Sequence, residues 1–154
     1  EFRTFLKLSP PLRSEEDRLS LIDGIKNDLI DVIVSDHIPE DEESKRLPFA
    51  QAATGSIGIE TLLSLSLELY HNDSLPLDKI IKCLTINPAK ILKINKGTLK
   101  EGSDADLCIF DLEKPWVVKA ENLQSKSKNT AIENRKLQGK VKMTLLKGEV
   151  VYSI

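Results

Sequence analysis

The residues of this sequence best suited to chemistry are a carboxylate and an imidazole that stand side by side, Asp36 and His37. They directly follow Asp31–Ser35, whose β-branched apolar centre is typical of a short strand buried on both faces. Pro39 fixes its own φ and lacks an N–H, so the chain must leave the sheet here as a loop. Side chains at the carboxyl ends of parallel strands converge on ligands in α/β folds. This pair is therefore a candidate catalytic or metal-binding site.

A structural role is the alternative for both residues. An aspartate after a strand often caps a turn or the next helix, and a histidine beside it is often an ordinary polar loop residue. One Asp-His pair also does not complete a metal site. The second histidine, His71, stands beside Asn72 and Asp73 at the end of a predicted helix, where an interaction with the helix dipole explains it.

Size and composition predict one ordinary soluble protein domain with a real core. The chain has 154 residues, of which 40% are hydrophobic and 30% charged, and its net charge is −2. These values argue against disorder and against a nucleic-acid partner. No apolar run approaches the roughly 18 residues that a membrane span needs, and the N-terminus lacks signal-peptide features, so we expect a cytoplasmic protein without a membrane partner. Cys83 and Cys108 lack disulfide or zinc-ligand spacing, which predicts two buried, reduced thiols.

The elements that must position Asp36 start with a predicted strand at Thr4–Leu8. Two prolines then impose a stiff turn, and Ser14 caps a helix whose first turn is acidic, which complements the helix dipole. The apolar face of this helix comprises Leu19, Ile22 and Ile25. With the strand at Asp31–Ser35, the order is β-loop-α-β, as in a parallel crossover unit.

A polar stretch of about twenty residues, 36–56, follows the Asp-His pair. Ordered loops of this length tend to cover active sites, which predicts a lid over 41–55 that is mobile without ligand and held mainly by Pro48 and Phe49. A disordered surface insertion is the alternative. The apolar residues at 47–50 and 52–53 favour the lid, because they gain from burial.

The remaining pattern changes from helical to β near residue 96, which divides the chain into two regions, βα units at 1–95 and a small strand-rich module at 96–154. Trp116 is expected to fill the core between the later strands. Between the strands, 119–140 is expected to be mainly loop. The predicted helices are 57–70, one capped by Ser74 or Asp78, and a short one opened by Asn87-Pro88-Ala89; the predicted strands are 107–110, 141–146 and 149–152.

Eight short motifs follow one another along the chain. They are Lys7-Leu-Ser-Pro-Pro-Leu-Arg-Ser14, Asp31-Val-Ile-Val-Ser-Asp-His-Ile-Pro39, Leu47-Pro-Phe49, Gly58-Ile-Glu-Thr61, Asn87-Pro-Ala89, Lys96-Gly-Thr-Leu99, Gly102-Ser-Asp-Ala-Asp106 and Ser125-Lys-Ser-Lys-Asn-Thr130. Each motif alone is weak, but in order and spacing they together resemble the C-terminal half of the dihydroorotases of the amidohydrolase superfamily.

The resemblance implies an α/β fold, the C-terminal part of a (β/α)₈ TIM-type barrel followed by part of a small β-sandwich. It implies a zinc-dependent hydrolase acting on a cyclic amide, which interconverts N-carbamoyl-L-aspartate and dihydroorotate in pyrimidine biosynthesis. Zinc polarises the amide and activates water, and the aspartate at the end of the eighth strand binds metal and shuttles the proton. Asp36 occupies that position.

The implied substrate-binding residues are Ser9, Glu40, Thr54 and Gly55, and they depart from the family pattern. Ser9 replaces a usual Asn, and Glu40 replaces a usual His that helps to hold the substrate carboxylate. The charge of Glu40 would repel an anionic substrate. Thr54-Gly55 replaces a backbone contact pair, which tolerates a changed side chain. These departures keep open a non-catalytic, dihydroorotase-like scaffold partner of aspartate transcarbamoylase. A hydantoin-type cyclic amide is a third possibility.

The other zinc ligands of the family, which include further histidines, are expected outside this sequence, because it contains only His37 and His71. We therefore expect the chain to be part of a longer polypeptide whose remainder is its first partner, with a homodimer or aspartate transcarbamoylase as further candidates. Expressed alone, residues 1–154 are expected to aggregate, to oligomerise or to fail to fold, because strand edges and apolar helix faces would be unpaired. They are also expected to bind no stoichiometric zinc.

Overall fold

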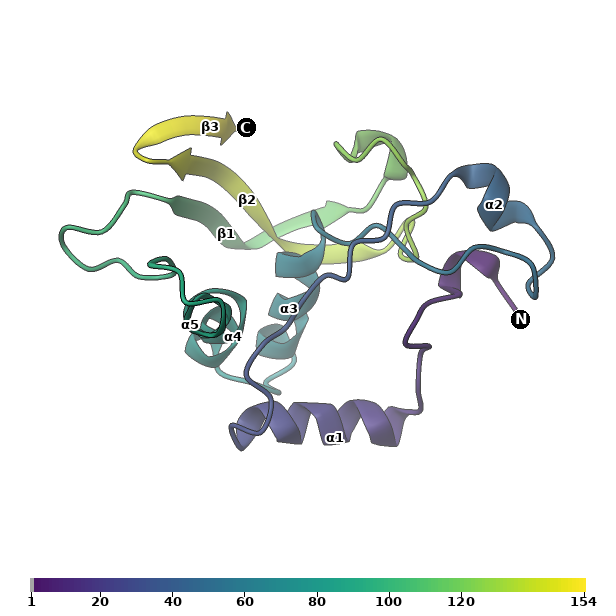
Figure 1. Ribbon diagram of the computed structural model, residues 1–154, viewed down its shortest axis with the longest axis horizontal. Helices are drawn as coiled ribbons and strands as arrows, with labels where there is room; N and C mark the ends of the chain where they lie inside the picture. The colour runs from purple at the N-terminus through teal and green to yellow at the C-terminus, as the bar shows by residue number, and fades with distance from the viewer. Residues whose placement is uncertain (1) are drawn as a thin grey trace. The chain divides into compact units, whose positions relative to one another are not determined.

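The computed structural model describes residues 2–154, which group into two compact units that interleave along the chain (Figure 1). Unit 1 comprises residues up to 18 together with 35–62 and 117–136, and unit 2 comprises 19–34, 63–116 and 137–154. None of the helices among the described residues has the length and apolar character required to cross a bilayer. The division into 1–95 and 96–154 stays a prediction.

Helix α1 (Glu15–Lys26) begins where its capping residues predict. The Ser14 hydroxyl accepts the Asp17 N–H at 3.2 Å, and the Asp17 carboxylate accepts the Ser14 N–H at 3.1 Å and its O–H at 2.7 Å. This reciprocal arrangement satisfies backbone donors that the first turn leaves free. Ile22 and Ile25 are buried, as predicted, whereas Leu19, the third residue of the predicted apolar face, is 50% exposed.

Unit 2 packs α1 with α3 (Leu62–His71), α4 (Leu77–Leu84) and α5 (Ile86–Ile91). The buried centre of this unit consists of Ile22, Ile25, Leu75, Ile80 and Cys83. Burial of such side chains contributes about 1.5–3 kcal/mol each. Burial also raises the pKa of the Cys83 thiol, which keeps it protonated, as expected for a core cysteine.

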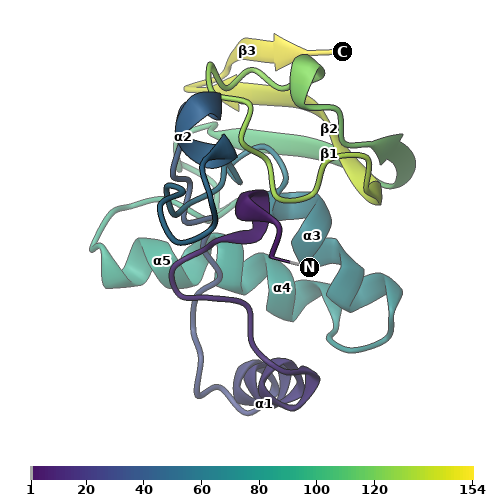
Figure 2. The same ribbon diagram turned by 90° about the vertical axis from the view of Figure 1, so that its right-hand side faces the viewer.

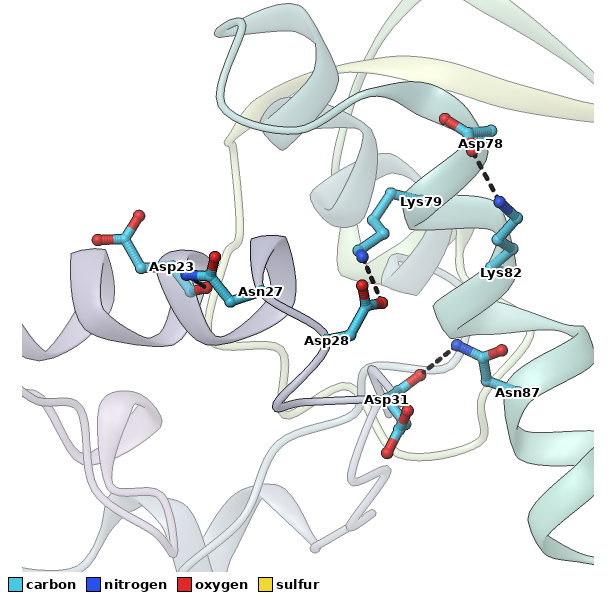
Figure 3. Close-up of polar contacts among 8 residues, drawn as sticks. All are labelled: Asp23, Asn27, Asp28, Asp31, Asp78, Lys79, Lys82 and Asn87. Carbon is cyan, nitrogen blue, oxygen red and sulfur yellow. Dashed lines mark hydrogen bonds and ion pairs between the residues drawn. The ribbon is translucent and has the colours of Figure 1, made fainter.

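Polar contacts fix the connections at the edge of that core (Figure 3). Lys79 of α4 forms an ion pair with Asp28, which follows α1, at 2.5 Å. Asn87 of α5 donates from its side-chain amide to the carbonyl of Asp31 at 3.0 Å. The chain entering the Asp31–Ser35 segment is thereby held to α4 and α5.

A three-stranded sheet in the order β1 (Leu107–Val117), β2 (Lys136–Leu146) and β3 (Glu149–Ser153) completes unit 2, and the views in Figures 1 and 2 show its strands in that order. β2 and β3 are antiparallel, with Leu146 opposite Glu149. The Trp116 indole N–H lies within hydrogen-bonding distance of the Ser64 hydroxyl at 3.1 Å and the Gly139 carbonyl at 3.2 Å, which connects the sheet to α3.

Several predicted elements differ in the structure. Residues 4–6 form the 3₁₀ helix η1 (Thr4–Leu6) in place of a strand, and 31–35 is extended without a strand ladder. A strand exists only where a neighbour accepts its hydrogen bonds, and Ile33 N–H donates instead to the Cys83 carbonyl at 3.2 Å.

The bounds of several helices and strands, and the exposure of one cysteine, also differ from the prediction. The helix predicted at 57–70 begins at Leu62, because residues 58–61 form a turn, and α4 begins after Pro76 without a side-chain cap. β1 and β2 are longer than predicted, so 136–140 is strand and not loop. Cys108 is exposed.

Unit 1 contains little regular structure besides η1, α2 (Glu42–Arg46) and η2 (Ala120–Asn122). The α2 helix lies in the 36–56 stretch, and its N-cap Asp41 accepts the Ser44 N–H at 2.7 Å. The buried side chains of the unit include several polar ones: Lys45, Thr61, Asn129 and Thr130. In this unit, buried polar side chains such as Lys45 and Asn129 therefore bind backbone carbonyls that in a sheet would be paired with a neighbouring strand.

Candidate functional site

Asp36 is exposed and stands where the extended 31–35 segment bends away. Its φ is +43°, a left-handed value that aspartate and asparagine tolerate better than most residues. The next residue forms an isolated parallel bridge with Ser56, and Ile38 N–H donates to the Ser56 carbonyl at 2.9 Å. The left-handed backbone of Asp36 thus immediately precedes the short pairing with Ser56.

His37 has a structural position rather than a free imidazole. Its Nδ1 accepts the Gly58 N–H at 3.1 Å and the Ile59 N–H at 3.4 Å. A Cβ on Gly58 would lie 2.8 Å from the Ser35 carbonyl, so only glycine lets the two segments approach this closely. With Nδ1 occupied in this way, His37 fastens the Asp36 bend to residues 58–59.

Two lysines hold the 41–55 loop to the first residues of the chain. The Lys45 ammonium is completely buried and donates to the carbonyls of Lys7 at 3.3 Å, Ala53 at 2.9 Å and Gly55 at 2.9 Å. The Lys7 ammonium donates to the carbonyls of residues 49, 50 and 52. Two lysine ammonium groups thus hold the loop through backbone carbonyls, a contribution that the sequence did not indicate. Phe49 also takes part, because its ring centroid lies 5.2 Å from that of Phe2 and its carbonyl accepts from Lys7. Mobility of the loop stays a prediction.

The charge of Lys45 makes the stability of this unit depend on pH. Burial lowers the pKa of Lys45, while the charge of Glu40 opposes that shift and Lys7 adds to it. Between the lowered value and the ordinary 10.5, the unfolded chain therefore binds more protons than the folded chain. The free energy of unfolding must then rise as pH increases through this window.

We expect full-length wild-type protein to gain stability over a Lys45→Met variant when the pH is raised from about 7 to the ordinary lysine pKa of 10.5. Methionine has no proton to release, so the stability of the variant does not depend on a titration at position 45. The other titratable groups are the same in both proteins, and their contributions cancel when the two stabilities are subtracted. Denaturant unfolding of both proteins at the two pH values measures the difference. A difference that does not change with pH would contradict the lowered pKa.

Asn129 joins the two segments that carry the remaining candidate residues. Its side-chain amide donates to the carbonyls of Ile38 at 3.1 Å and Gly55 at 3.4 Å, and its side-chain oxygen accepts the Glu40 N–H at 3.2 Å. Asn129 is 1% exposed, so these bonds are sheltered from water. Its role was missed from the sequence, where the Ser125–Thr130 motif indicated only family resemblance.

The structure places all five predicted site residues in unit 1. Glu40 and Thr54 are half-buried, Gly55 is buried, and Asn129 connects Glu40 with Gly55. Ser9 and Asp36 are exposed, and among the described residues no hydrogen bond joins either to that group. The roles of these five residues are taken up below as proposals.

The candidate metal donors at this site are the side chains of Asp36 and His37. Residues 2–154 contain no group of three or more His, Cys, Asp or Glu side chains placed to hold one ion. Asp36 offers one exposed carboxylate, whereas Nδ1 of His37 is already occupied by backbone N–H groups. The described residues thus fit a single ligand position and not a whole zinc site.

Residues 8–151 match the amidohydrolase family. The dihydroorotase of Ehrlichia chaffeensis is 48% identical over 146 residues, which cover 95% of this chain and 33% of that protein. The chain therefore spans about a third of the length of the curated relatives that it matches.

Solved structures give the same result for the fold. The L-hydantoinase of Arthrobacter aurescens superposes with a TM-score of 0.88 at 34% identity, covering 99% of this chain and 35% of that one. The dihydropyrimidinase of Brevibacillus agri gives a TM-score of 0.90 at 25% identity, covering 97% and 34%. These neighbours imply a TIM-barrel-type fold. The chain belongs to the amidohydrolase family.

Proposed function

We propose that the protein containing this chain is a dihydroorotase of the cytoplasm, which interconverts dihydroorotate and N-carbamoyl-L-aspartate. The observation that carries the proposal is the name shared by relatives that are 40–48% identical over nearly the whole chain. The matched stretches cover 95–99% of this chain. The substrate would be a small anionic molecule with a cyclic amide.

In this proposal, residues 1–95 form the last βα units of a (β/α)₈ barrel and 96–154 form part of a β-sandwich. The extended 31–35 segment would be the eighth strand, and 4–8 would belong to the seventh. Asp36 then lies at the carboxyl end of a barrel strand, where TIM-barrel enzymes place their chemistry. The exposure and bend of Asp36 support this placement.

Asp36 would take a proton from the attacking water and deliver it to the ring nitrogen. The water oxygen bonds to the amide carbon, the C–N bond breaks, and the ring N–H takes up the transferred proton and leaves as the NH₂ of the ureido group. Ring closure reverses these transfers. A zinc ion, when bound, supplies Lewis acidity for the carbonyl and for water, and Asp36 would give it one carboxylate oxygen. The other ligands would come from outside this sequence.

The Thr54-Gly55 pair would contact substrate through the Thr54 peptide. The Gly55 N–H already donates to the Lys7 carbonyl at 3.0 Å, and the Gly55 carbonyl accepts from Lys45 and Asn129. Within residues 2–154, neither backbone group of Thr54 takes part in a hydrogen bond. Thr54 is half-buried, so its N–H and carbonyl remain the available groups of the pair. Ser9 and Glu40 would line the same substrate site.

The test is an assay of purified, zinc-loaded full-length protein with dihydroorotate and with hydantoin. We expect kcat/KM for dihydroorotate to exceed that for hydantoin by about tenfold or more, because the site must recognise a carboxylate that hydantoin lacks. Preference for hydantoin would instead support the cyclic-amide activity named in the structural neighbours.

A non-catalytic scaffold for aspartate transcarbamoylase is the second candidate, and the replacements at Ser9 and Glu40 favour it. Both positions differ from the pattern that the resemblance implies for substrate binding. Absence of dihydroorotate turnover in zinc-loaded protein, together with co-elution with aspartate transcarbamoylase in gel filtration, would replace the enzyme proposal with this one. A homodimer is a further possible assembly, and the same gel filtration measures it.

A Glu40→His variant is expected to lower KM for dihydroorotate, because it removes a negative charge and adds a donor for the substrate carboxylate. The expected gain is about 1–3 kcal/mol, the scale of a hydrogen bond to a charged group. Initial-rate kinetics on the full-length protein measure it. Glu43→His makes the same exchange at an exposed position of α2 and should leave KM unchanged. If both variants keep the wild-type KM, the Glu40 side chain points away from the substrate.

A further inference from the structure

The fully buried ammonium of Lys45 calls for an explanation beyond packing. Its exposed fraction is 0%, and its hydrogen-bond partners are the backbone carbonyls of Lys7, Ala53 and Gly55. A charge is costly to remove from water, and an apolar side chain of similar volume often serves stability as well or better. Packing alone therefore does not explain why a lysine, and not an apolar residue, stands at position 45.

Satisfying the carbonyls is not a sufficient reason either. The Lys7 carbonyl also accepts the Gly55 N–H at 3.0 Å, and the Gly55 carbonyl also accepts from the Asn129 amide. Among the described residues, only the Ala53 carbonyl has Lys45 as its single donor. Two of the three acceptors would keep a partner if Lys45 were replaced.

The positions of the three acceptor carbonyls suggest another reason. Two of them flank Thr54, and the third belongs to the segment that leads to Ser9. Ala53 and Gly55 are the residues immediately before and after Thr54, so one ammonium holds the peptides on both sides. The third acceptor, Lys7, lies two residues before Ser9 in the segment that enters the same proposed substrate site. Lys45 thus ties the Thr54 turn to the Ser9 segment through a single atom.

We propose that Lys45 is a positioning residue for substrate binding, whose buried ammonium fixes the Thr54 peptide so that its free N–H and carbonyl meet the substrate. This inference rests on the dihydroorotase proposal for the identity of the substrate. Asn129 supports the same turn from the other side, because it binds the Gly55 carbonyl together with the backbone of Ile38 and Glu40.

The experiment compares full-length wild-type protein with Lys45→Met, which keeps the length of the side chain and removes its donors. We expect KM for dihydroorotate to rise by about tenfold, with kcat within about twofold of wild type, because Asp36 is not among the groups that Lys45 holds. The matched control is Lys128→Met, which also removes an ammonium bound to a backbone carbonyl, that of Leu123 at 2.7 Å. Its KM should stay at the wild-type value.

Amide hydrogen exchange gives a readout that does not depend on turnover. In Lys45→Met, exchange at the Gly55 N–H should accelerate by about tenfold or more, while the Val118 N–H, bonded to the Arg135 carbonyl at 2.9 Å, should keep its rate. If Lys45→Met does not fold, Lys45→Gln, which retains one amide donor, replaces it and is expected to shift both values in the same direction.

Three results would overturn the inference: unchanged exchange at Gly55, faster exchange with unchanged KM, or a fall in kcat and melting temperature without a rise in KM. Wild-type protein without dihydroorotate turnover would refute the proposed function separately. In that case the claim that Lys45 fixes the Thr54 turn is decided by hydrogen exchange alone.

Discussion

Replacement of Asp36 by Asn in the full-length protein is expected to lower kcat by about 10³-fold, within the range of a lost general acid–base group. The amide cannot accept and return a proton at neutral pH, and it is a poor ligand for zinc. Substrate affinity should change much less than rate, because the proposed substrate contacts are the other residues of the site. Steady-state kinetics of both proteins measure the two quantities.

The fold of this variant is expected to survive, and the backbone explains why. Asp36 has a φ of +43°, and asparagine is the residue that, besides aspartate and glycine, most readily adopts such values. The matched control is Asp41→Asn, the same chemical change at the N-cap of α2, where asparagine caps as well as aspartate. An Asp36→Asn protein with near-normal kcat would remove Asp36 from the proposed mechanism.

Gly55→Ala is expected to cost about 3 kcal/mol of unfolding free energy and to abolish substrate binding, by the magnitudes typical of backbone strain and overpacking. The φ of Gly55 is +137°, and an added Cβ would lie 2.5 Å from the Ile38 side chain and 3.2 Å from its carbonyl. The turn must therefore move away from the segment that leads from Asp36. That movement would break the bonds that Lys45 and Asn129 make to the Gly55 carbonyl.

Gly102→Ala separates the two components of this effect. Gly102 has a φ of +83°, but nothing lies within 4 Å of an added Cβ. Its cost should be limited to the backbone, about 1 kcal/mol. Urea unfolding and equilibrium binding of dihydroorotate to the three full-length proteins give the comparison. Equal losses of stability for both variants would show that contact with Ile38 is unimportant.

Local sequence signals determined several elements of this protein without help from the fold. The Ser14 cap and the spacing of Ile22 and Ile25 placed α1, because capping and helical periodicity act within a few residues. The predicted strands 141–146 and 149–152 left only Lys147-Gly148 between them, which placed the hairpin of β2 and β3 for the same reason. The position of Asp36 at the end of an apolar segment was also a local signal.

Other features depended on partners distant in the sequence. The 31–35 segment has strand-like composition, but a ladder needs a neighbouring strand, and its Ile33 N–H finds the Cys83 carbonyl instead. β1 continues to Val117 through Pro115 because pairing with β2 extends it beyond its apolar start. The exposure of Cys108 likewise depends on how much of β1 is covered, since the neighbouring Ile109 is exposed as well, and composition alone does not indicate that.

The candidate site likewise has one part that the sequence indicated and another that only the tertiary structure shows. Residue types at Ser9, Asp36, Glu40 and Thr54-Gly55 were visible in the sequence, together with the loop that separates them. Only the tertiary structure decided that Lys45, in a charged run typical of a solvated helix, is buried among carbonyls. It also brought Asn129 to the Glu40 N–H across 89 positions of the chain. Hydrogen bonds between segments so far apart leave no periodic trace in the sequence, because their partners meet only once the chain has folded.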